Sequence, residues 1–256
     1  MEFDLSDIKF SNNDLEKGLI LPKMLAPKLA YLCGIFTGDG SIFQRKEKRD
    51  YLLKCVGNPK DERELYYEVI GPYFKDTFGF MPNIRLHDSN TTFGFTVLSK
   101  GLLQFLTAKA GLMKGKKDGN LGIPEIFKND KELIIHFIRG LFDTDGCMCF
   151  KKRYRSYPYY PVISVSSSSE KLMREVAKEL KEIGFKVVEI YNYKIFDSRF
   201  KNGFSLINRV ELNGVKNLEL WKSKIGFYSP KHLNKIRKYY ENKTVALATV
   251  NSGRKI

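Results

Sequence analysis

Two similar nine-residue stretches, one in each half of the chain, constrain its fold more than any other feature. Residues 32–40 read LCGIFTGDG and residues 138–146 read IRGLFDTDG, and each is an apolar run that ends in Asp-Gly. Small residues recur at a spacing of four in both, at Gly34 and Gly38 in the first and at Gly140 and Thr144 in the second. Residues at this spacing share one helix face, and small ones allow a second helix to approach at backbone distance.

If the two predicted helices pack on each other, Asp39 and Asp145 meet at one end of the pair. Each helix is expected to end at its Asp-Gly, because glycine readily supplies the left-handed conformation of a helix cap. A single Asp-Gly is an ordinary helix end followed by a turn. Two of them on matching repeats predict a paired-carboxylate site built from an internal duplication.

The sequence after each stretch runs through the same order of predicted elements. Strands are predicted at 41–46, 51–56, 81–87 and 91–98, with helices at 61–79 and 101–112. The second copy repeats this order. Ser167 and Glu170 stand at capping-box spacing and predict the start of its first helix. Its strands are predicted at 147–155, 159–166, 185–195 and 203–212, and two more helices at 214–225 and 231–243. We therefore predict an α+β protein with a lead-in over residues 1–25, an N-terminal half over 26–128 and a C-terminal half over 129–256.

Composition narrows the class of protein. With 43% hydrophobic residues in 256, the chain can bury a substantial core. It has no apolar stretch of membrane-spanning length, and its acidic N-terminus lacks the apolar core of a signal peptide. The four cysteines match no zinc pattern, so we expect buried free thiols and a reducing intracellular compartment, the cytoplasm or an organelle.

Positive charge is concentrated in the second half. Residues 1–130 carry 19 Lys and Arg against 17 Asp and Glu, a net charge of +2, whereas residues 131–256 carry 25 against 12, a net charge of +13. A one-sided basic surface is typical of proteins that bind a polyanion such as nucleic acid. We expect the second half to contribute more of that affinity.

Both stretches resemble the signature of the LAGLIDADG homing endonucleases, and two copies in one chain are similar to the pseudo-dimeric members of that family. Asp39 and Asp145 stand at the acidic position that ends the signature. Thr37 departs from the family's commoner first Asp, which Asp143 keeps; that position is not the metal ligand in the family. The resemblance covers about residues 26–240. It implies two αββαββα halves joined through the signature helices, with two antiparallel sheets that form a saddle over DNA.

Phosphodiester hydrolysis needs an activated water, charge stabilisation at phosphorus and help for the leaving oxygen, and a divalent metal held by carboxylates supplies all three. Mg²⁺ is typically held by few protein carboxylates together with water and substrate oxygens. We therefore expect Asp39 and Asp145, with the backbone carbonyls of Gly38 and Thr144, to bind Mg²⁺, for which Mn²⁺ or Ca²⁺ could substitute in binding.

Two further stretches resemble the family's active-site lysine segments. In GKKDGNLGIP, Lys117 is the better match by its distance to the proline and Lys116 is the alternative; in FYSPKHLNKI, Lys231 takes the same role. A lysine beside the scissile phosphate stabilises developing charge or positions the water. Alignment with the family also places Asn58 and Ser167 near the pocket, where they could order water, although both are ordinary turn and cap residues as well.

The strands that follow each signature are expected to contact DNA, because a two-stranded ribbon fits the major groove and alternate side chains face the same way. Any one basic strand residue fits a solvated surface equally well, but the set favours DNA. The candidates are Arg45, Lys54, Arg85, His87, Lys151, Arg153, Arg155, Lys194 and Arg209.

The resemblance implies a monomeric, site-specific endonuclease that cuts double-stranded DNA across the minor groove of a long asymmetric target site and leaves 3′ overhangs. The alternatives are an RNA maturase with its host intron RNA as partner and a DNA-binding protein that does not cut. The Met start and NSGRKI end favour a free-standing or intron-encoded enzyme over a protein-splicing element. No membrane partner is expected.

Overall fold

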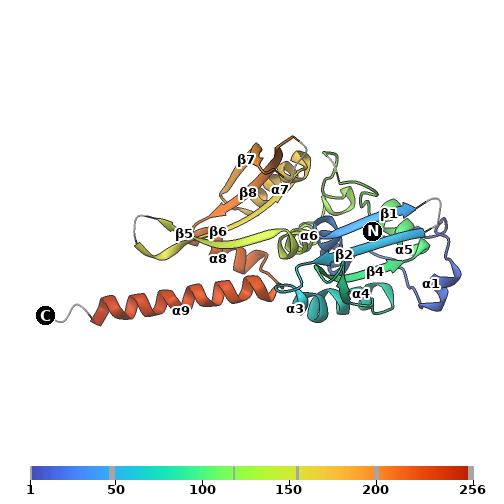
Figure 1. Cartoon of the computed structure of the whole chain (residues 1–256), viewed down its shortest axis with the longest axis horizontal. Coiled ribbons are helices and arrows are strands. Elements are labelled where there is room, and N and C mark those ends of the chain that lie inside the picture. Colours follow the sequence, from blue (N-terminus) through green and yellow to red (C-terminus); the bar gives the residue numbers. More distant parts are fainter. Residues whose placement is uncertain (1, 46–49, 118, 154–155, 199–201, 253–256) are drawn as a thin grey trace.

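The computed structural model describes residues 2–45, 50–117, 119–153, 156–198 and 202–252, and within them the chain forms two four-stranded antiparallel sheets with helices packed on one side (Figure 1). The strand order is β1-β2-β4-β3 in the first sheet and β5-β6-β8-β7 in the second. The same order in both sheets confirms the predicted α+β class and the doubled organisation.

The N-terminal half follows the predicted order of elements. It consists of α1 (Asn12–Glu16), α2 (Pro27–Gly38), β1 (Gly40–Arg45), β2 (Asp50–Gly57), α3 (Arg63–Leu65), a π-helical segment (Tyr66–Ile70), α4 (Gly71–Phe78), β3 (Arg85–His87), β4 (Thr92–Leu98), α5 (Lys100–Gln104) and a second π-helical segment (Phe105–Lys109). The lead-in packs on this half, because Phe3, Ile8, Leu19 and Leu21 are buried in its core.

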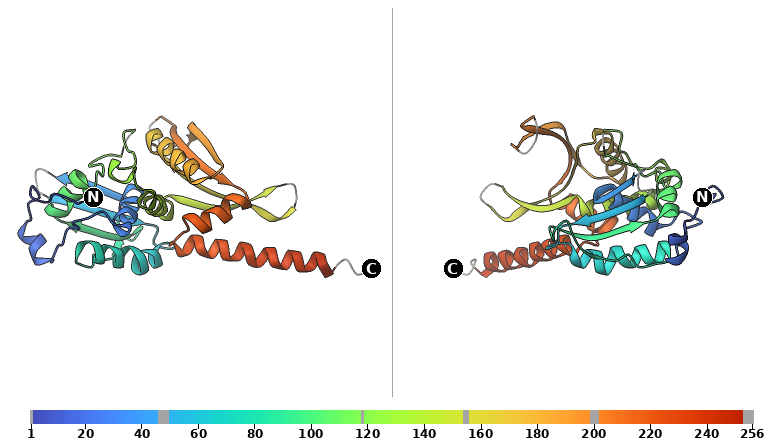
Figure 2. Two further views of the ribbon diagram at one scale, coloured as in Figure 1. Left: turned by 180° about the vertical axis from the view of Figure 1, so that it is seen from behind. Right: turned by 45° about the vertical axis from the view of Figure 1, so that its right-hand side comes forward.

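The C-terminal half repeats the arrangement after a 3₁₀ turn (Glu125–Phe127). It consists of α6 (Lys131–Thr144), β5 (Gly146–Arg153), β6 (Ser156–Ser167), α7 (Glu170–Ile183), β7 (Val187–Phe196), β8 (Phe204–Asn213), α8 (Val215–Lys224) and α9 (Pro230–Ser252). The cap of α7 is Ser169 and not the predicted Ser167. Helix α9 is longer than predicted because no Pro or Gly follows Pro230 before Gly253. It runs alongside the β5–β6 hairpin (Figure 2), where the Tyr239 ring stacks on that of Phe150 at 5.0 Å.

The two halves are joined through α2 and α6, which pack at backbone distance. A Cβ atom added at Gly34 would collide with the carbonyl oxygen of Phe137, and one at Gly140 would collide with that of Tyr31. Buried residues of both halves consequently form one hydrophobic cluster. The spacing of small residues in the sequence therefore correctly predicted that these two helices pack on each other.

The glycines that follow the two aspartates do not form the predicted left-handed helix caps. Gly40 and Gly146 do not adopt the left-handed conformation; they begin strands β1 and β5. A Cβ atom at either one would collide with the carbonyl oxygen of Phe36 or Phe142, respectively, in the preceding helix turn. These two positions therefore need glycine because the strand leaves the helix end at close range.

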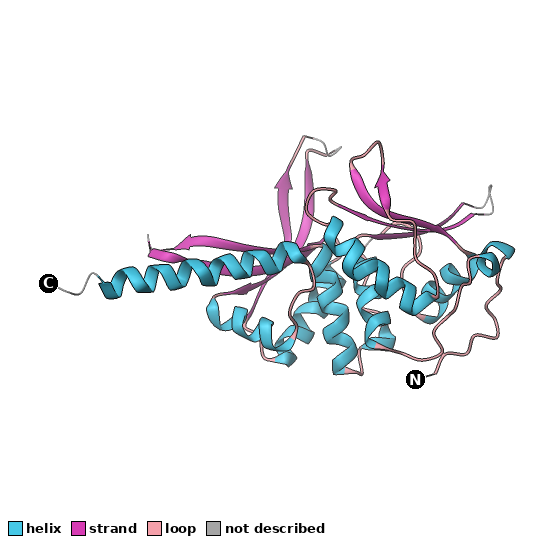
Figure 3. Ribbon diagram, turned by 90° about the horizontal axis from the view of Figure 1, so that it is seen from below, coloured by secondary structure: helices cyan, strands magenta, loops and turns pink. Residues whose placement is uncertain are grey.

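Each sheet has one face covered by helices and one face without helices, which we call the open face (Figure 3). In the first sheet, Leu53, Cys55 and Phe95 point into the core, so alternation places Lys54 and Thr96 on the open face. In the second sheet, the core residues Met148 and Ile163 pair with each other, which places Cys147 and Ser164 on the open face. Among the described residues, no helix has the length and apolar composition needed to cross a membrane.

Candidate active site

The ends of α2 and α6 bring Asp39 and Asp145 together. Each aspartate caps the C-terminus of its helix. A Cβ atom at Gly38 would collide with the hydroxyl of Thr144 and would lie 3.3 Å from the carboxyl carbon of Asp145. The small residue at position 38 thus lets the two helix ends, and the two carboxylates that follow them, meet at one place.

The environment of this pair favours protonation of both carboxyl groups. Burial, then the negative charges of Glu62 and Asp145, raises the pKa of Asp39 to about 8, although Tyr66 donates a hydrogen bond of 3.2 Å to it. Asp145 lines a pocket on the open face, where desolvation of its carboxyl group by the surrounding protein outweighs the opposing charge of Lys117 and raises its pKa to about 6. The two groups are therefore hard to ionise together unless a further positive charge joins them.

Lys117 approaches the end of the first signature helix. Its Nζ donates hydrogen bonds to the carbonyl oxygens of Thr37, at 2.7 Å, and of Gly38. Lys116 is exposed. Burial lowers the pKa of Lys117, while Asp145 and Asp39 act in the opposite direction. Of the two lysines considered from the sequence, the structure brings Lys117 to the aspartates.

Lys231 reaches the same centre by a contact that the sequence did not reveal. Its Nζ lies 2.7 Å from Glu62 Oε1, and Glu62 is 5% exposed. Glu62 precedes α3 in the first half, whereas Lys231 lies in α9 of the second half. Sequence reasoning missed Glu62 because it stands in a run of four polar residues, DERE, with nothing to distinguish it from solvated neighbours.

Asn58 and Ser167 occupy turn positions at the ends of β2 and β6. The Asn58 side chain accepts a hydrogen bond from the Lys60 N–H, and its own backbone N–H donates to Glu62. The Ser167 hydroxyl accepts from the Ser169 N–H, while the neighbouring Ser166 lines a pocket on the open face together with Asp145. Asn58 is therefore linked to the centre through its backbone, and the structure places Ser166, not Ser167, beside Asp145.

Several predicted DNA contacts share the open faces. Strand pairing places Lys54, Arg85 and His87 on the open face of the first sheet. Lys151 and Arg209 line an open-face pocket of 200 Å³ next to Asp145, with Cys147, Cys149 and Glu211 also in its wall. The prediction of buried thiols therefore holds for Cys33 and Cys55 but is wrong for Cys147, which is exposed because its strand alternates toward the open face.

The other candidates divide into two groups. Lys194 pairs with Leu206 and lies over the ring of Phe204, on the face of β7–β8 opposite to Arg209, and its side chain is exposed. A β-bulge between Ile190 and Tyr193 shifts the register of β7 against β8 and so places the two basic residues on opposite faces. Arg45 and Arg153 lie in strands, but their side chains fall outside the described part, and Arg155 lies outside the described residues.

The oxygen atoms at the helix ends fit a hard divalent cation. Two carboxylates and the Gly38 carbonyl, which accepts a hydrogen bond from Lys117, converge there. Burial is the main cause of the raised pKa values of the two carboxylates, and the negative charge of Glu62 adds to it. Across the described residues, no three His, Cys, Asp or Glu side chains form a metal cage. A cation bound by Asp39 and Asp145 would thus complete its coordination with water and substrate, as Mg²⁺ commonly does.

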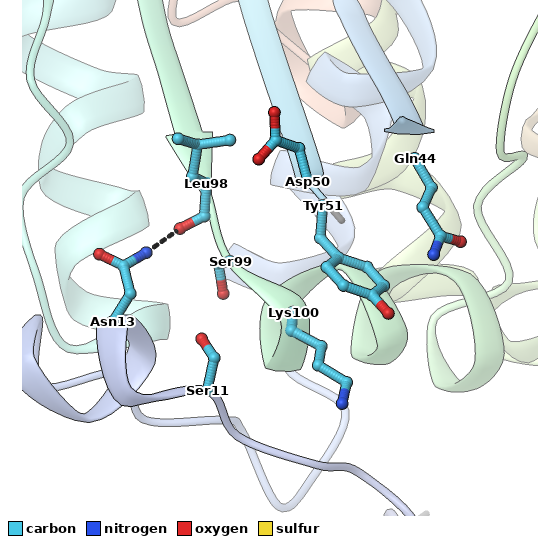
Figure 4. A pocket seen from close by; sticks show the side chains of 8 residues that line it. All are labelled: Ser11, Asn13, Gln44, Asp50, Tyr51, Leu98, Ser99 and Lys100. Carbon is cyan, nitrogen blue, oxygen red and sulfur yellow. Dashed lines mark hydrogen bonds between the residues drawn. The ribbon is translucent and has the colours of Figure 1, made fainter. Parts of the chain in front are cut away.

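A separate cavity of 730 Å³ lies at the end of the β1–β2 hairpin that is remote from Asp39 (Figure 4). Because Gly40 adjoins the aspartate and Gln44 and Asp50 stand at the opposite end of the same strands, this cavity does not belong to the carboxylate centre. It is lined by Ser11, Asn13, Gln44, Asp50, Tyr51, Leu98, Ser99 and Lys100.

Comparison with known folds identifies similar structures. Residues 132–226 match the family model of the LAGLIDADG-like domain, which covers α6 to α8. The homing endonuclease I-DmoI in complex with DNA and Mn has a TM-score of 0.53 at 16% identity, over 78% of this chain and 96% of that chain. I-DmoI in complex with DNA and Ca gives 0.55 at 15% identity, over 83% and 97%. These likenesses confirm the predicted fold.

The curated relatives share only part of their length with this chain. An uncharacterized protein of Methanocaldococcus jannaschii is 26% identical over 147 residues, which are 56% of this chain and 48% of that protein. Ribonucleoside-diphosphate reductase NrdEB subunit alpha of Bacillus subtilis is 24% identical over 168 residues, 63% of this chain and 15% of that protein. The chain spans less than half the length of either relative.

Proposed function

Because the chain contains a LAGLIDADG-like domain and has the fold of the single-chain LAGLIDADG homing endonucleases, we propose that it is a site-specific endonuclease that cuts both strands of DNA. The observation that carries this proposal is the meeting of Asp39 and Asp145 at the ends of α2 and α6. A protein that only binds DNA has no need for two neighbouring carboxylates that repel each other beside a basic surface.

The open faces supply the DNA-binding surface in this proposal. Lys54, Arg85, Lys151 and Arg209 project from strands that flank the carboxylate pair, so a duplex held along both sheets passes over it. The pseudo-dimeric arrangement suits a monomer acting on a long asymmetric site. Cutting across the minor groove with 3′ overhangs follows from the family resemblance.

Asp39 and Asp145 would hold Mg²⁺, and Mn²⁺ or Ca²⁺ in binding, as the I-DmoI complexes with Mn and Ca support by analogy. The bound cation supplies charge stabilisation at phosphorus and a more acidic water. The chain's own residues have two further roles in this proposal. Each aspartate serves one strand, and Lys117 and Lys231 place positive charge beside the reacting phosphates. A reducing intracellular compartment with access to DNA suits this activity.

The test begins with selection of a cleaved duplex from a randomised DNA library incubated with the protein and Mg²⁺. We expect Asp39→Asn and Asp145→Asn each to abolish double-strand cutting of the selected duplex while its affinity, measured in Ca²⁺, changes little. Asp76→Asn, at an exposed carboxylate of α4 on the helix side of the first half, is the matched control and should still cut.

Full cutting by either of the first two variants would contradict the assignment of the aspartates. If the wild-type protein binds a specific duplex but does not cleave it in Mg²⁺ or Mn²⁺, we would conclude that it is a non-cleaving DNA-binding protein and not a nuclease. If the protein stimulates intron splicing without cleaving DNA, we would conclude that it is a maturase.

A further inference from the structure

We propose that Glu62 is a positioning residue that holds Lys231 at the centre, so that cleavage of one DNA strand, and not of the other, depends on Glu62. This inference rests on the proposed nuclease function and concerns how the two halves of the centre differ.

Glu62 is fixed on both of its oxygens. Oε1 contacts Lys231 Nζ at 2.7 Å, and Oε2 accepts a hydrogen bond of 2.6 Å from the Asn58 N–H. The side chain is buried, so water does not compete effectively with these partners. A carboxylate engaged in this way is not a free general base, and its role is to fix the ammonium group that it pairs with.

This ion pair lies beside the paired aspartates. A Cβ atom added at Gly57 would collide with Glu62 Oε2 and would lie 2.8 Å from Asp39 Oδ2, so both carboxylates border the same small space. The charge of Glu62 also acts on both Asp39 and Asp145. Lys231, carried by the second half, is thereby held at a first-half carboxylate next to the first-half aspartate.

The corresponding position in the second half is not acidic. Glu62 is the residue that caps the start of α3 after the β1–β2 hairpin, and Ser169 caps the start of α7 after the β5–β6 hairpin. The Ser169 hydroxyl hydrogen-bonds the carbonyls of Leu121, at 2.6 Å, and Gly119, at 3.2 Å. Each cap residue therefore contacts the lysine-bearing segment of the other half, but Glu62 pairs with the lysine itself whereas Ser169 holds only neighbouring backbone.

The two lysines consequently depend on different groups. Lys117 is held by the carbonyls of Thr37 and Gly38, which no side-chain substitution removes. Lys231 is held by one carboxylate, and a lysine side chain with four rotatable bonds disperses when that carboxylate loses its charge. Loss of Glu62 should therefore affect the strand that uses Lys231 and spare the strand that uses Lys117.

Strand-resolved cleavage tests this asymmetry. The duplex is the one selected for cleavage by the wild-type protein, labelled on one strand at a time. Lys231→Met defines the strand that depends on Lys231, and Lys117→Met defines the other. We expect Glu62→Gln to slow the first strand by at least tenfold and the second by less than twofold. Glu64→Gln, an exposed change in α3 two residues further along the chain, should behave as the wild type.

A double variant separates positioning from a general structural effect. If Glu62 acts through Lys231, adding Glu62→Gln to Lys231→Met should slow neither strand by more than another twofold. This comparison also removes both charges of the buried pair, so it remains available if Glu62→Gln alone fails to fold. Equal slowing of both strands, no slowing, or multiplication of the two effects would overturn the proposal.

A measurement without DNA distinguishes failure of this inference from failure of the nuclease assignment. Acetic anhydride labels free lysine amines, and mass spectrometry resolves the two peptides. We expect Glu62→Gln to increase the labelling rate of Lys231 severalfold and to leave that of Lys117 unchanged. If the wild type cuts no DNA but this difference appears, the nuclease assignment fails while the positioning contact stands. Equal labelling of Lys231 in both proteins would refute the contact.

Discussion

Tyr31 of α2 donates a hydrogen bond of 2.9 Å to the buried carboxylate of Asp143 in α6, which joins the two signature helices by a polar contact. Asp143 also accepts hydrogen bonds from the backbone N–H groups of Tyr228 and Ser229, the latter at 3.0 Å, immediately before Lys231. The corresponding Thr37 of the first half instead donates to the Cys33 carbonyl of its own helix. The Asp retained in the second signature thus anchors the segment that carries a candidate active-site lysine.

Asp143→Asn should destabilise the protein by about 2–3 kcal/mol, because the amide nitrogen would face N–H and O–H donors that have no other acceptor in place. Urea unfolding followed by circular dichroism measures this loss. Asp130→Asn, at the N-cap of the same helix, is the control and should cost only a few tenths of a kcal/mol, since Asn caps as well as Asp. Similar losses in both variants would argue against the anchoring role.

Gly34→Ala and Gly140→Ala should each destabilise the protein by about 3 kcal/mol or more, because the added methyl group collides with backbone of the facing helix, which cannot rotate away. Thermal unfolding is the measurement. Gly119→Ala provides the comparison, since a Cβ atom there meets nothing within 4 Å. A small loss at Gly34 would mean that the helices separate without penalty.

Lys117→Met should reduce the rate of DNA cleavage by about 10²-fold or more, whereas Lys116→Met should leave it nearly unchanged. Lys117 is the lysine whose ammonium lies at the end of α2, and Lys116 is exposed. Single-turnover cleavage of the selected duplex compares the two variants at equal net charge. Equal effects would indicate that the segment acts through charge alone.

Stability should respond to pH through Asp39. Its folded-state pKa of about 8 exceeds that of the unfolded chain, about 4, so the folded protein binds this proton more tightly. The stabilisation from protonation is complete below about pH 4 and is lost as the pH rises through 8. The melting temperature of Asp39→Asn relative to wild type should therefore increase from pH 5 to pH 8.

Excess Mg²⁺ should raise the melting temperature of the wild type at pH 8 and change that of Asp39→Asn much less, because a bound cation replaces the proton as the neutralising charge. Removal of the metal by a chelator should reverse the shift. If the melting temperatures of the wild type and Asp39→Asn instead change in parallel from pH 5 to pH 8, the raised pKa of Asp39 is contradicted.

DNA affinity should depend more on the second sheet than on the first. Lys54 is engaged by Asp88 at 2.7 Å, whereas Lys151 and Arg209 share Glu211 at the longer distances of 3.4 and 3.6 Å. We expect a Lys151→Gln, Arg209→Gln double variant to weaken binding, and to lower its salt dependence, more than a Lys54→Gln, Arg85→Gln double variant. Fluorescence anisotropy at several salt concentrations measures both quantities, and equal weakening would refute the expectation.

Local patterns were enough to predict the elements and the carboxylate pair. The spacing of Gly34, Gly38, Gly140 and Thr144 identified a helix contact, because positions four apart share a helix face whatever the rest of the fold does. Strand alternation correctly placed Lys54 and Arg85. Alternation alone does not give the face of Lys194, because one β-bulge reverses the faces of β7 and leaves no clear mark in the sequence.

The sequence by itself determined that this chain is a duplicated α+β protein with Asp39 and Asp145 at matching helix ends, since each of these features depends on residues within a few positions of one another. Only the tertiary structure decided which groups surround the aspartates. The Lys231–Glu62 ion pair and the anchoring of Tyr228 by Asp143 join segments far apart in the chain. Such contacts arise from how α2 and α6 bring the halves together, and no periodicity along the sequence records them.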